Sequence, residues 1–339
     1  MIRKNVKWIV GVLVLAMVSP FLFRFASCAT DDGGKGHTGG VGVVEEKPLP
    51  AVEFSSDTAY SFTEKIISFG PRVSTGSKGY IPVRNWVVGQ FKRLGADVVE
   101  QHFKATSYKG KAIDGTNIIA RYNEGNPNRV VLAVHWDSRD VADQDKDRSS
   151  EPIVGADDSG SGMGMLLEIG RQFQLKPPPV GVDIVFFDAE DLGESKSEEN
   201  GWCIGSKYWA NQAVAQGYKP KYGILLDMAG AQGARFAKEQ ITMQYAGIVC
   251  DKVWKVGQQL GYGNFFVDEA TGRITDDHKY VNEIAHIPMI DIINIQADGH
   301  FGDYWHTHKD DQIGVVAHET LRAVGKTLLT TVYMEGVNQ

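Results

Sequence analysis

The sequence predicts an α/β protein, in which a single domain over residues 51–339 has a central mixed β-sheet with helices on both faces. From about residue 55 onward, short β-branched or aromatic runs alternate with amphipathic stretches of helical spacing. Two of the runs, 182–187 and 222–226, are almost continuously apolar, which is typical of strands covered on both faces. No break in composition divides the region, so we expect one hydrophobic core.

Composition and charge set outer limits on function. The chain has 339 residues, of which 42% are hydrophobic, enough to bury a core and to exclude global disorder. The formal net charge is −7, and this acidic balance argues against a nucleic-acid partner, because neutralising phosphates requires a basic face.

Residues 1–27 are predicted to be a signal peptide. Three basic residues precede an uncharged stretch over 8–18, which is too short to span a bilayer that needs about 20 apolar residues. Ala26 and Ser27 stand directly before Cys28, as in the cleavage box of bacterial lipoproteins, in which the cysteine carries the lipid. The alternative is ordinary signal cleavage with Cys28 incidental. We expect an exported protein of the cell envelope or periplasm, anchored to the membrane through Cys28, with residues 28–50 as a flexible tether.

The first half of the domain is expected to begin with two helices. One covers 58–69 and ends at Gly70-Pro71, and the other covers 82–94 and stops at Gly95. Turn residues then separate three short runs with strand composition, at 98–103, 117–122 and 130–134.

The second half alternates more regularly. The apolar strands at 182–187 and 222–226 lie between stretches of helical periodicity, and a further strand is expected near the C-terminus at 288–295. The expected helices are at 163–173, 208–215, 249–260 and 315–334.

Acidic residues and histidines follow these strands at the ends where ligands bind in open α/β sheets. They are His135 and Asp137, Asp157 and Asp158 before a helix, Glu190 and Asp191, Asp227, and finally His306. A single aspartate in such a place is usually a helix cap. Adjacent carboxylates at the end of an apolar strand would repel each other, however, and a divalent cation removes that conflict. Zinc accepts histidine and carboxylate ligands, and a free neighbouring carboxylate can act as general base or acid.

Other motifs are absent or incomplete. The sequence has no Gly-x-Ser-x-Gly elbow, His-Glu-x-x-His helix or phosphate-binding Gly-x-x-x-x-Gly-Lys. The spacing Asp143-x-Asp145-x-Asp147 resembles the start of a calcium loop, but the sixth position is Arg148 rather than glycine. We interpret this stretch as a solvated surface loop.

Six motifs in order resemble the zinc-dependent aminopeptidase superfamily, and most closely its glutaminyl-peptide cyclotransferase branch of the animal type. The resemblance covers the chain from about Phe54 to the C-terminus. The motifs are His-x-Asp (135–137), Gly-Ala-Asp-Asp-Ser-Gly (155–160), Phe-Phe-Asp-x-Glu-acid (186–191), Leu-Leu-Asp (225–227), Asp-Asp-His (276–278) and Trp-His-Thr (305–307).

The resemblance implies a zinc aminopeptidase-like fold and a role for each matching residue. Asp157, Asp191 and His306 would bind zinc, and Glu190 would shuttle the proton. Asp227 and Asp276 would surround the substrate amine and the leaving amide, with Trp305 as part of the pocket. His135 and Asp137 match positions that bind or support a second metal in the aminopeptidases. This chain departs from the pattern by having Asp191 where the second glutamate is usual, and by an insertion at 193–200.

The activity implied is cyclisation of the N-terminal glutamine of peptides or proteins to pyroglutamate, with release of ammonia and one zinc per chain. The main rival is a two-metal aminopeptidase that uses His135, Asp157, Asp191, Asp227 and His306. Trp305 and the motif at 276–278 favour the cyclase. A non-enzymatic envelope receptor on the same fold is expected to have lost ligands, and none is missing here. The residues leave open whether Cys203 and Cys250 form a disulfide.

Overall fold

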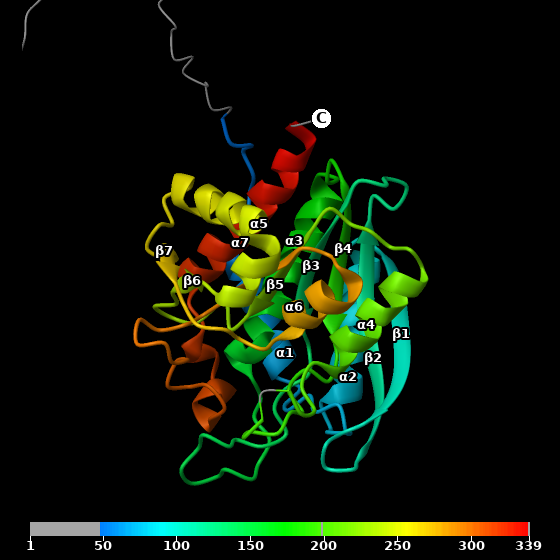
Figure 1. Cartoon of the computed structure of the whole chain (residues 1–339), viewed down its shortest axis with the longest axis vertical. Helices are drawn as coiled ribbons and strands as arrows, with labels where there is room; N and C mark the ends of the chain where they lie inside the picture. Colours follow the sequence, from blue (N-terminus) through cyan, green and yellow to red (C-terminus); the bar gives the residue numbers. More distant parts are fainter. Residues whose placement is uncertain (1–47, 198, 338–339) are drawn as a thin grey trace, which may run out of the picture. The chain divides into compact units, whose positions relative to one another are not determined.

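The centre of the molecule is a six-stranded mixed sheet in the order β1-β2-β4-β3-β5-β8. Figure 1 shows the computed structural model, which describes residues 48–197 and 199–337. The predicted signal peptide, Cys28 and the tether up to residue 47 therefore lie outside the described residues. Residues 48–339 group as one unit, so the single α/β domain expected from the sequence is confirmed.

Four strands of this sheet run parallel and bring their carboxyl ends to the same edge. They are β4 (Gly181–Phe187), β3 (Arg129–His135), β5 (Gly223–Asp227) and β8 (Met289–Ile293). The remaining two, β1 (Asp97–Thr106) and β2 (Ala112–Tyr122), pair antiparallel with each other, and β2 is antiparallel to β4. Residues placed directly after the parallel strands must consequently meet at one edge.

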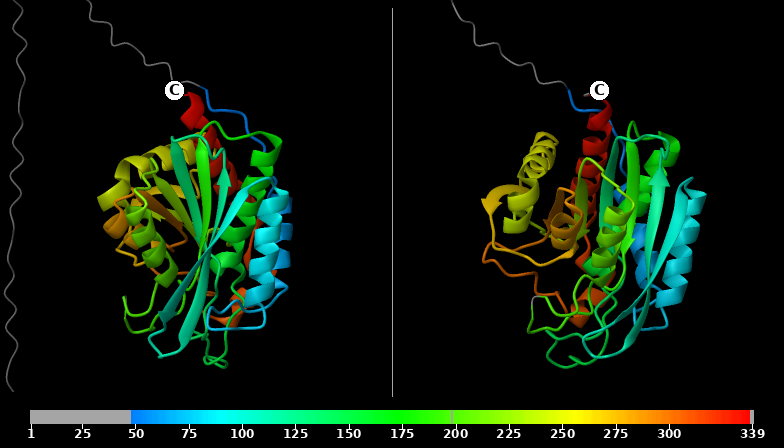
Figure 2. Two further views of the ribbon diagram at one scale, coloured as in Figure 1. Left: turned by 90° about the vertical axis from the view of Figure 1, so that its right-hand side faces the viewer. Right: turned by 45° about the vertical axis from the view of Figure 1, so that its right-hand side comes forward.

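Helices cover both faces of the sheet, as Figure 2 shows. Alternate residues of β3 pack into different clusters: Val130 and Leu132 join the core with α1 (Ser56–Ile67), α2 (Tyr80–Arg93), α3 (Gly162–Leu175) and α7 (His318–Val337). Val131 and Ala133 pack instead with α4 (Ile204–Ala215). Burial on both faces explains why the central strands have almost no polar residues.

Each predicted helix and strand is present, with some boundaries shifted. Helix α5 (Gln240–Gln259) begins well before the predicted residue 249, because the side chain of Glu239 caps it by accepting from the backbone N–H groups of Ile241 and Thr242. The short strands β6 (Phe236–Lys238) and β7 (Phe266–Ala270) and the one-turn helix α6 (Asp277–Tyr280) were not expected.

Two further features bear on the sequence analysis. Cys203 and Cys250 are both buried and free, so they form no disulfide in this structure. Within residues 48–197 and 199–337, no helix has the length and the apolar character needed to cross a membrane.

Candidate active site

The strand ends deliver a set of metal-binding and acidic side chains to one pocket of about 430 Å³. Its lining includes Glu190 and Asp191 after β4, Asp227 at the end of β5, Asp158 from the turn before α3, and His306 from the chain after β8. His135, the last residue of β3, contacts Asp158 and Asp227.

One group of three buried side chains has the spacing of a cation site. Nε2 of His306 lies 3.5 Å from Oδ1 of Asp191 and 3.9 Å from Oδ2 of Asp158. Ligand atoms about 2.0–2.2 Å from a tetrahedral zinc ion lie about 3.3–3.6 Å from one another. Oδ2 of Asp191 is also buried without a hydrogen-bond partner. An imidazole and two carboxylates in this arrangement fit zinc.

The structure corrects the ligand expected at Asp157, because it is the neighbouring Asp158 that joins Asp191 and His306. Both oxygens of Asp157 are already occupied. Its Oδ1 accepts from Oγ of Ser161 and from the backbone N–H of Gly230, and its Oδ2 accepts from the hydroxyl of Tyr304, each at 2.7 Å. Asp157 therefore ties together three segments of the domain and does not face the pocket.

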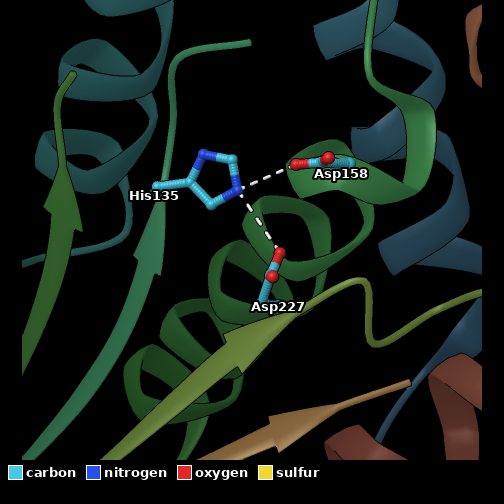
Figure 3. A group of neighbouring side chains, drawn as sticks. All are labelled: His135, Asp158 and Asp227. Carbon is cyan, nitrogen blue, oxygen red and sulfur yellow. Dashed lines mark ion pairs between the residues drawn. The ribbon is translucent and has the colours of Figure 1, made fainter. Parts of the chain in front are cut away.

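A second group, His135 with Asp158 and Asp227, shares one residue with the first (Figure 3). Nε2 of His135 is 3.0 Å from Oδ1 of Asp158 and 3.4 Å from Oδ1 of Asp227. The shorter distance is that of a direct charge-assisted hydrogen bond. Asp158 thus turns one oxygen to His135 and the other toward His306.

Asp137 and Asp310 hold the loops that carry these side chains. Asp137 accepts from the backbone N–H groups of Glu190 and Asp191 at 3.0 and 3.2 Å. Asp310 does the same for Asp157 and Asp158, at 2.9 and 3.1 Å. Asp137, expected to bind or support a second metal, belongs to no group of potential metal ligands among the described residues. It fixes the backbone of the acidic pair, and its Oδ1 also lies 3.6 Å from Nδ1 of His135, which is a supporting position.

Glu190 lies beside the first group with its carboxylate held by a thiol. Sγ of Cys203 donates to Oε1 of Glu190 at 3.2 Å, and Asp276 lies in the same buried group. Burial raises the pKa of Glu190 well above its usual range, and the carboxylates of Asp191 and Asp276 raise it further. Burial also raises the pKa of Cys203, so this thiol remains protonated and is a poor metal ligand.

The other carboxylates around Glu190 share its tendency to hold a proton. Burial, opposed by His135, raises the pKa of Asp227 to about 7. Burial likewise raises the pKa of Asp276 and that of Asp291 behind it. In contrast, burial alone would lower the pKa of His306, but Asp191 and Asp143 raise it to about 9. The pocket floor therefore has a negative potential that favours a cation, either a metal or a proton.

Aromatic side chains and the insertion complete the pocket. The ring of Trp305 stacks on that of His306 with centroids 3.8 Å apart, and Phe301 packs against Trp305. Trp202 and residues 195–197 of the insertion line the same pocket. The insertion thus forms part of the pocket wall.

Sequence reasoning missed several residues that contact this site. Asp143 was interpreted as part of a solvated loop, but its Oδ1 lies 2.9 Å from Nδ1 of His306. Arg139 is buried between Asp143 and Asp191. The run of alternating aspartates at 143–147 was the only signal for Asp143, and nothing in the sequence indicated that Arg139 or Cys203 contacts the site.

Comparison with known proteins gives the family. The model of peptidase family M28 matches residues 117–332. The crystal structure of Tannerella forsythia glutaminyl cyclase is 42% identical, with a TM-score of 0.80, and the match covers 83% of this chain and 99% of that one. A Zn-dependent exopeptidase from Parabacteroides distasonis ATCC 8503 is 41% identical, with a TM-score of 0.80 and coverage of 84% and 99%.

A more distant curated relative points the same way. Glutaminyl-peptide cyclotransferase from Bos taurus is 26% identical over 278 residues, which are 70% of this chain and 71% of that protein. These matches confirm the resemblance seen in the motifs. The chain belongs to peptidase family M28, in the group that contains the bacterial glutaminyl cyclases.

Proposed function

We propose that this chain is a glutaminyl cyclase that converts the N-terminal glutamine of peptides or proteins into pyroglutamate and releases ammonia. The observation that carries the proposal is a buried proton acceptor, Glu190, next to the trio Asp158, Asp191 and His306 in a pocket walled by Trp305. The similarity to Tannerella forsythia glutaminyl cyclase supports the same reaction.

The trio is assigned to zinc. When bound there, zinc would polarise the γ-carbonyl of the substrate glutamine and stabilise the negative charge that develops on its oxygen. Asp158 takes the ligand role that the sequence had suggested for Asp157, and Asp191 replaces the more usual glutamate with a shorter carboxylate.

Glu190 moves the proton. As the α-amine nitrogen of the substrate forms a bond to the carbonyl carbon of its own γ-amide, the carboxylate of Glu190 accepts the proton that the amine loses. The same group then donates a proton to the amide nitrogen, and the carbon–nitrogen bond breaks to release ammonia. Burial raises the pKa of the Glu190 carboxyl, so this group holds a proton more readily than an exposed glutamate, which suits it to accept the proton and then to donate it.

Asp227 and Asp276 are assigned to the nitrogen atoms of the substrate. Both line the pocket, and each has a buried oxygen without a hydrogen-bond partner, Oδ1 in Asp227 and Oδ2 in Asp276. An amine or amide N–H would satisfy these acceptors. The α-amine binds beside Asp227, and Asp276 helps Glu190 to retain its proton.

A two-metal aminopeptidase remains the second candidate, because Asp158 is shared by two groups of potential ligands and could bridge two cations. The direct 3.0 Å pairing of His135 with Asp158 favours one metal, because it satisfies both side chains without a second cation. His135 is then a hydrogen-bonding support for Asp158 and not a ligand.

Product analysis distinguishes the two activities. The purified protein is incubated with a peptide that begins with glutamine, and the products are examined by mass spectrometry and an ammonia assay. A cyclase yields the full-length peptide less one ammonia, whereas an aminopeptidase yields free glutamine and a shortened peptide. Free glutamine as the main product would overturn the proposal.

We further propose that the protein is exported and is anchored through a lipid on Cys28, since this residue follows two small residues after an apolar stretch. The wild-type protein should then fractionate with membranes in its native cells, and Cys28→Ala should be released or left unprocessed. Wild-type protein recovered without lipid would contradict the anchor.

A further inference from the structure

Arg139 is a fully buried arginine in the loop after β3 that contacts two different parts of the site. A buried guanidinium is costly unless acceptors surround it, and here they come from both sides. One set belongs to the loop around Asp143, and the other to the segment from Asp191 to Ser195.

On the first side, Arg139 holds Asp143 with two nitrogens. Its Nε is 3.2 Å from Oδ1 and its Nη2 is 3.4 Å from Oδ2 of Asp143. The same Oδ1 lies 2.9 Å from Nδ1 of His306, whose other nitrogen faces the metal trio. A carboxylate behind a metal-binding histidine fixes the orientation of the ring and raises its basicity.

On the second side, Arg139 reaches another member of the trio and the pocket wall. Its Nη1 donates to the backbone oxygens of Asp191 and Gly193 at 3.1 and 2.9 Å, and its Nη2 donates to Oγ of Ser195 at 3.1 Å. The guanidinium carbon also lies 4.5 Å from the ring centre of Trp202. Gly193 packs so tightly under Trp202 that an added Cβ would lie 1.9 Å from the ring.

We infer that Arg139 is a positioning residue that couples zinc affinity to the order of the pocket wall formed by residues 193–197 and Trp202. The inference rests on the proposed function only in assigning zinc to Asp158, Asp191 and His306. Through Asp143 and Asp191, Arg139 fixes two of these three side chains, and the same guanidinium holds the wall. Binding of zinc therefore stabilises the wall, and loosening Arg139 weakens zinc binding.

The test compares Arg139→Lys, which keeps the charge but loses the planar fork, with the matched control Arg148→Lys. Arg148 lies in the same loop, but its side chain is about half exposed and pairs only loosely with Glu151, at 3.8 Å. The Kd for zinc is measured on the whole protein by competition with a chelator. Hydrogen exchange of peptides covering residues 191–197 is measured with and without zinc.

In the wild type and in Arg148→Lys, zinc should slow exchange in residues 191–197. In Arg139→Lys we expect a Kd for zinc that is about 10–100-fold higher, together with fast exchange that saturating zinc no longer slows. Wild-type Kd and wild-type exchange in a folded Arg139→Lys would overturn the inference. If Arg139→Lys does not fold, Asp143→Asn provides the test, since it leaves the guanidinium in place and removes the charge that links Arg139 to His306. A wild-type Kd for zinc in that variant would equally overturn the inference.

These readouts need no substrate, so the inference and the proposed function fail separately. Zinc binding that does not respond to Arg139 refutes the coupling and leaves the cyclase untouched. A protein that binds zinc with the expected dependence on Arg139, yet releases free glutamine, refutes the cyclase and leaves the coupling standing. Wild-type protein that binds no zinc refutes both.

Discussion

The adjacent residues Asp157 and Asp158 provide a sharp test of the site, because the structure gives them opposite roles. Asp158 faces Asp191 and His306, whereas Asp157 accepts three hydrogen bonds from Tyr304, Ser161 and Gly230. Replacing each by asparagine changes the charge with almost no change in shape. Asp158→Asn should lose zinc, and Asp157→Asn should keep zinc and lose stability.

The size of the effect at Asp157 follows from its contacts. An asparagine keeps one acceptor oxygen but turns an NH₂ group toward a donor that the carboxylate had satisfied, either the Tyr304 hydroxyl or the pair from Ser161 and Gly230. Hydrogen bonds to a charged group contribute about 1.5–3 kcal/mol each, so loss of one bond costs about 2 kcal/mol. For a domain of this size, this corresponds to a fall in Tm of about 3 °C.

The assay separates folding from metal binding. Thermal unfolding is followed in excess chelator, so that bound zinc does not contribute to Tm, and zinc content is measured after dialysis against metal-free buffer. We expect Asp157→Asn to melt lower but to carry wild-type zinc, and Asp158→Asn to carry almost none. A folded Asp157→Asn without zinc, beside an Asp158→Asn that retains it, would refute the assignment of the ligand.

Three further variants test the chemistry and the electrostatics. Glu190→Gln cannot accept the proton, so turnover should fall by about 10²–10⁴-fold with zinc still bound; near-normal turnover would remove Glu190 from the mechanism. Cys203→Ala removes the hydrogen-bond donor to Glu190 and should lower kcat more than it changes KM. Cys203→Ser should recover the activity, and Cys250→Ser, at the other buried cysteine, should have no effect. Equal activity in the Cys203→Ala and Cys203→Ser variants would contradict a positioning role for Cys203. Burial alone would raise the pKa of Glu335, but the contact with Lys252 lowers this pKa below its usual value. The ionised carboxylate therefore stabilises the fold at pH values above the unfolded pKa. This contribution is lost as the pH falls through the lower folded pKa. Glu335→Gln should therefore lower stability at pH 7 by about 1–2 kcal/mol, and this difference should shrink as the pH falls through the lowered folded pKa of Glu335. A difference that stays constant as the pH falls would refute the sign.

Much of the fold could be predicted because burial leaves a strong pattern in the sequence. Strand β4 is buried along its whole length, and its apolar run identifies it without ambiguity. The position of Asp191 and Asp227 at one edge followed from the rule that parallel strands end together. By contrast, β6 has three residues and α6 one turn, too few for any periodicity to emerge.

The finer details of the site depend on contacts between residues that are distant in the chain. Asp157 and Asp158 are the same residue type and are adjacent in the chain, so the choice between them is made by Tyr304 and Gly230, which only the fold brings near. The role of Asp143 depends in the same way on His306, more than 150 residues later. A local pattern cannot contain this information, which explains why the polar loop at 143–147 was interpreted as solvated.

The central claim is a cyclase with a single zinc held by Asp158, Asp191 and His306, and metal counting on active protein tests it most directly. The enzyme is stripped with a chelator and titrated with zinc, while ammonia release from a peptide with N-terminal glutamine is followed. A cyclase needs one Lewis acid, because the nucleophile is already part of the substrate and a second cation would repel the amine in its ammonium form. We predict that activity rises linearly and reaches its maximum at one zinc per chain. Activity that requires two zinc ions per chain would contradict the account and favour the two-metal aminopeptidase.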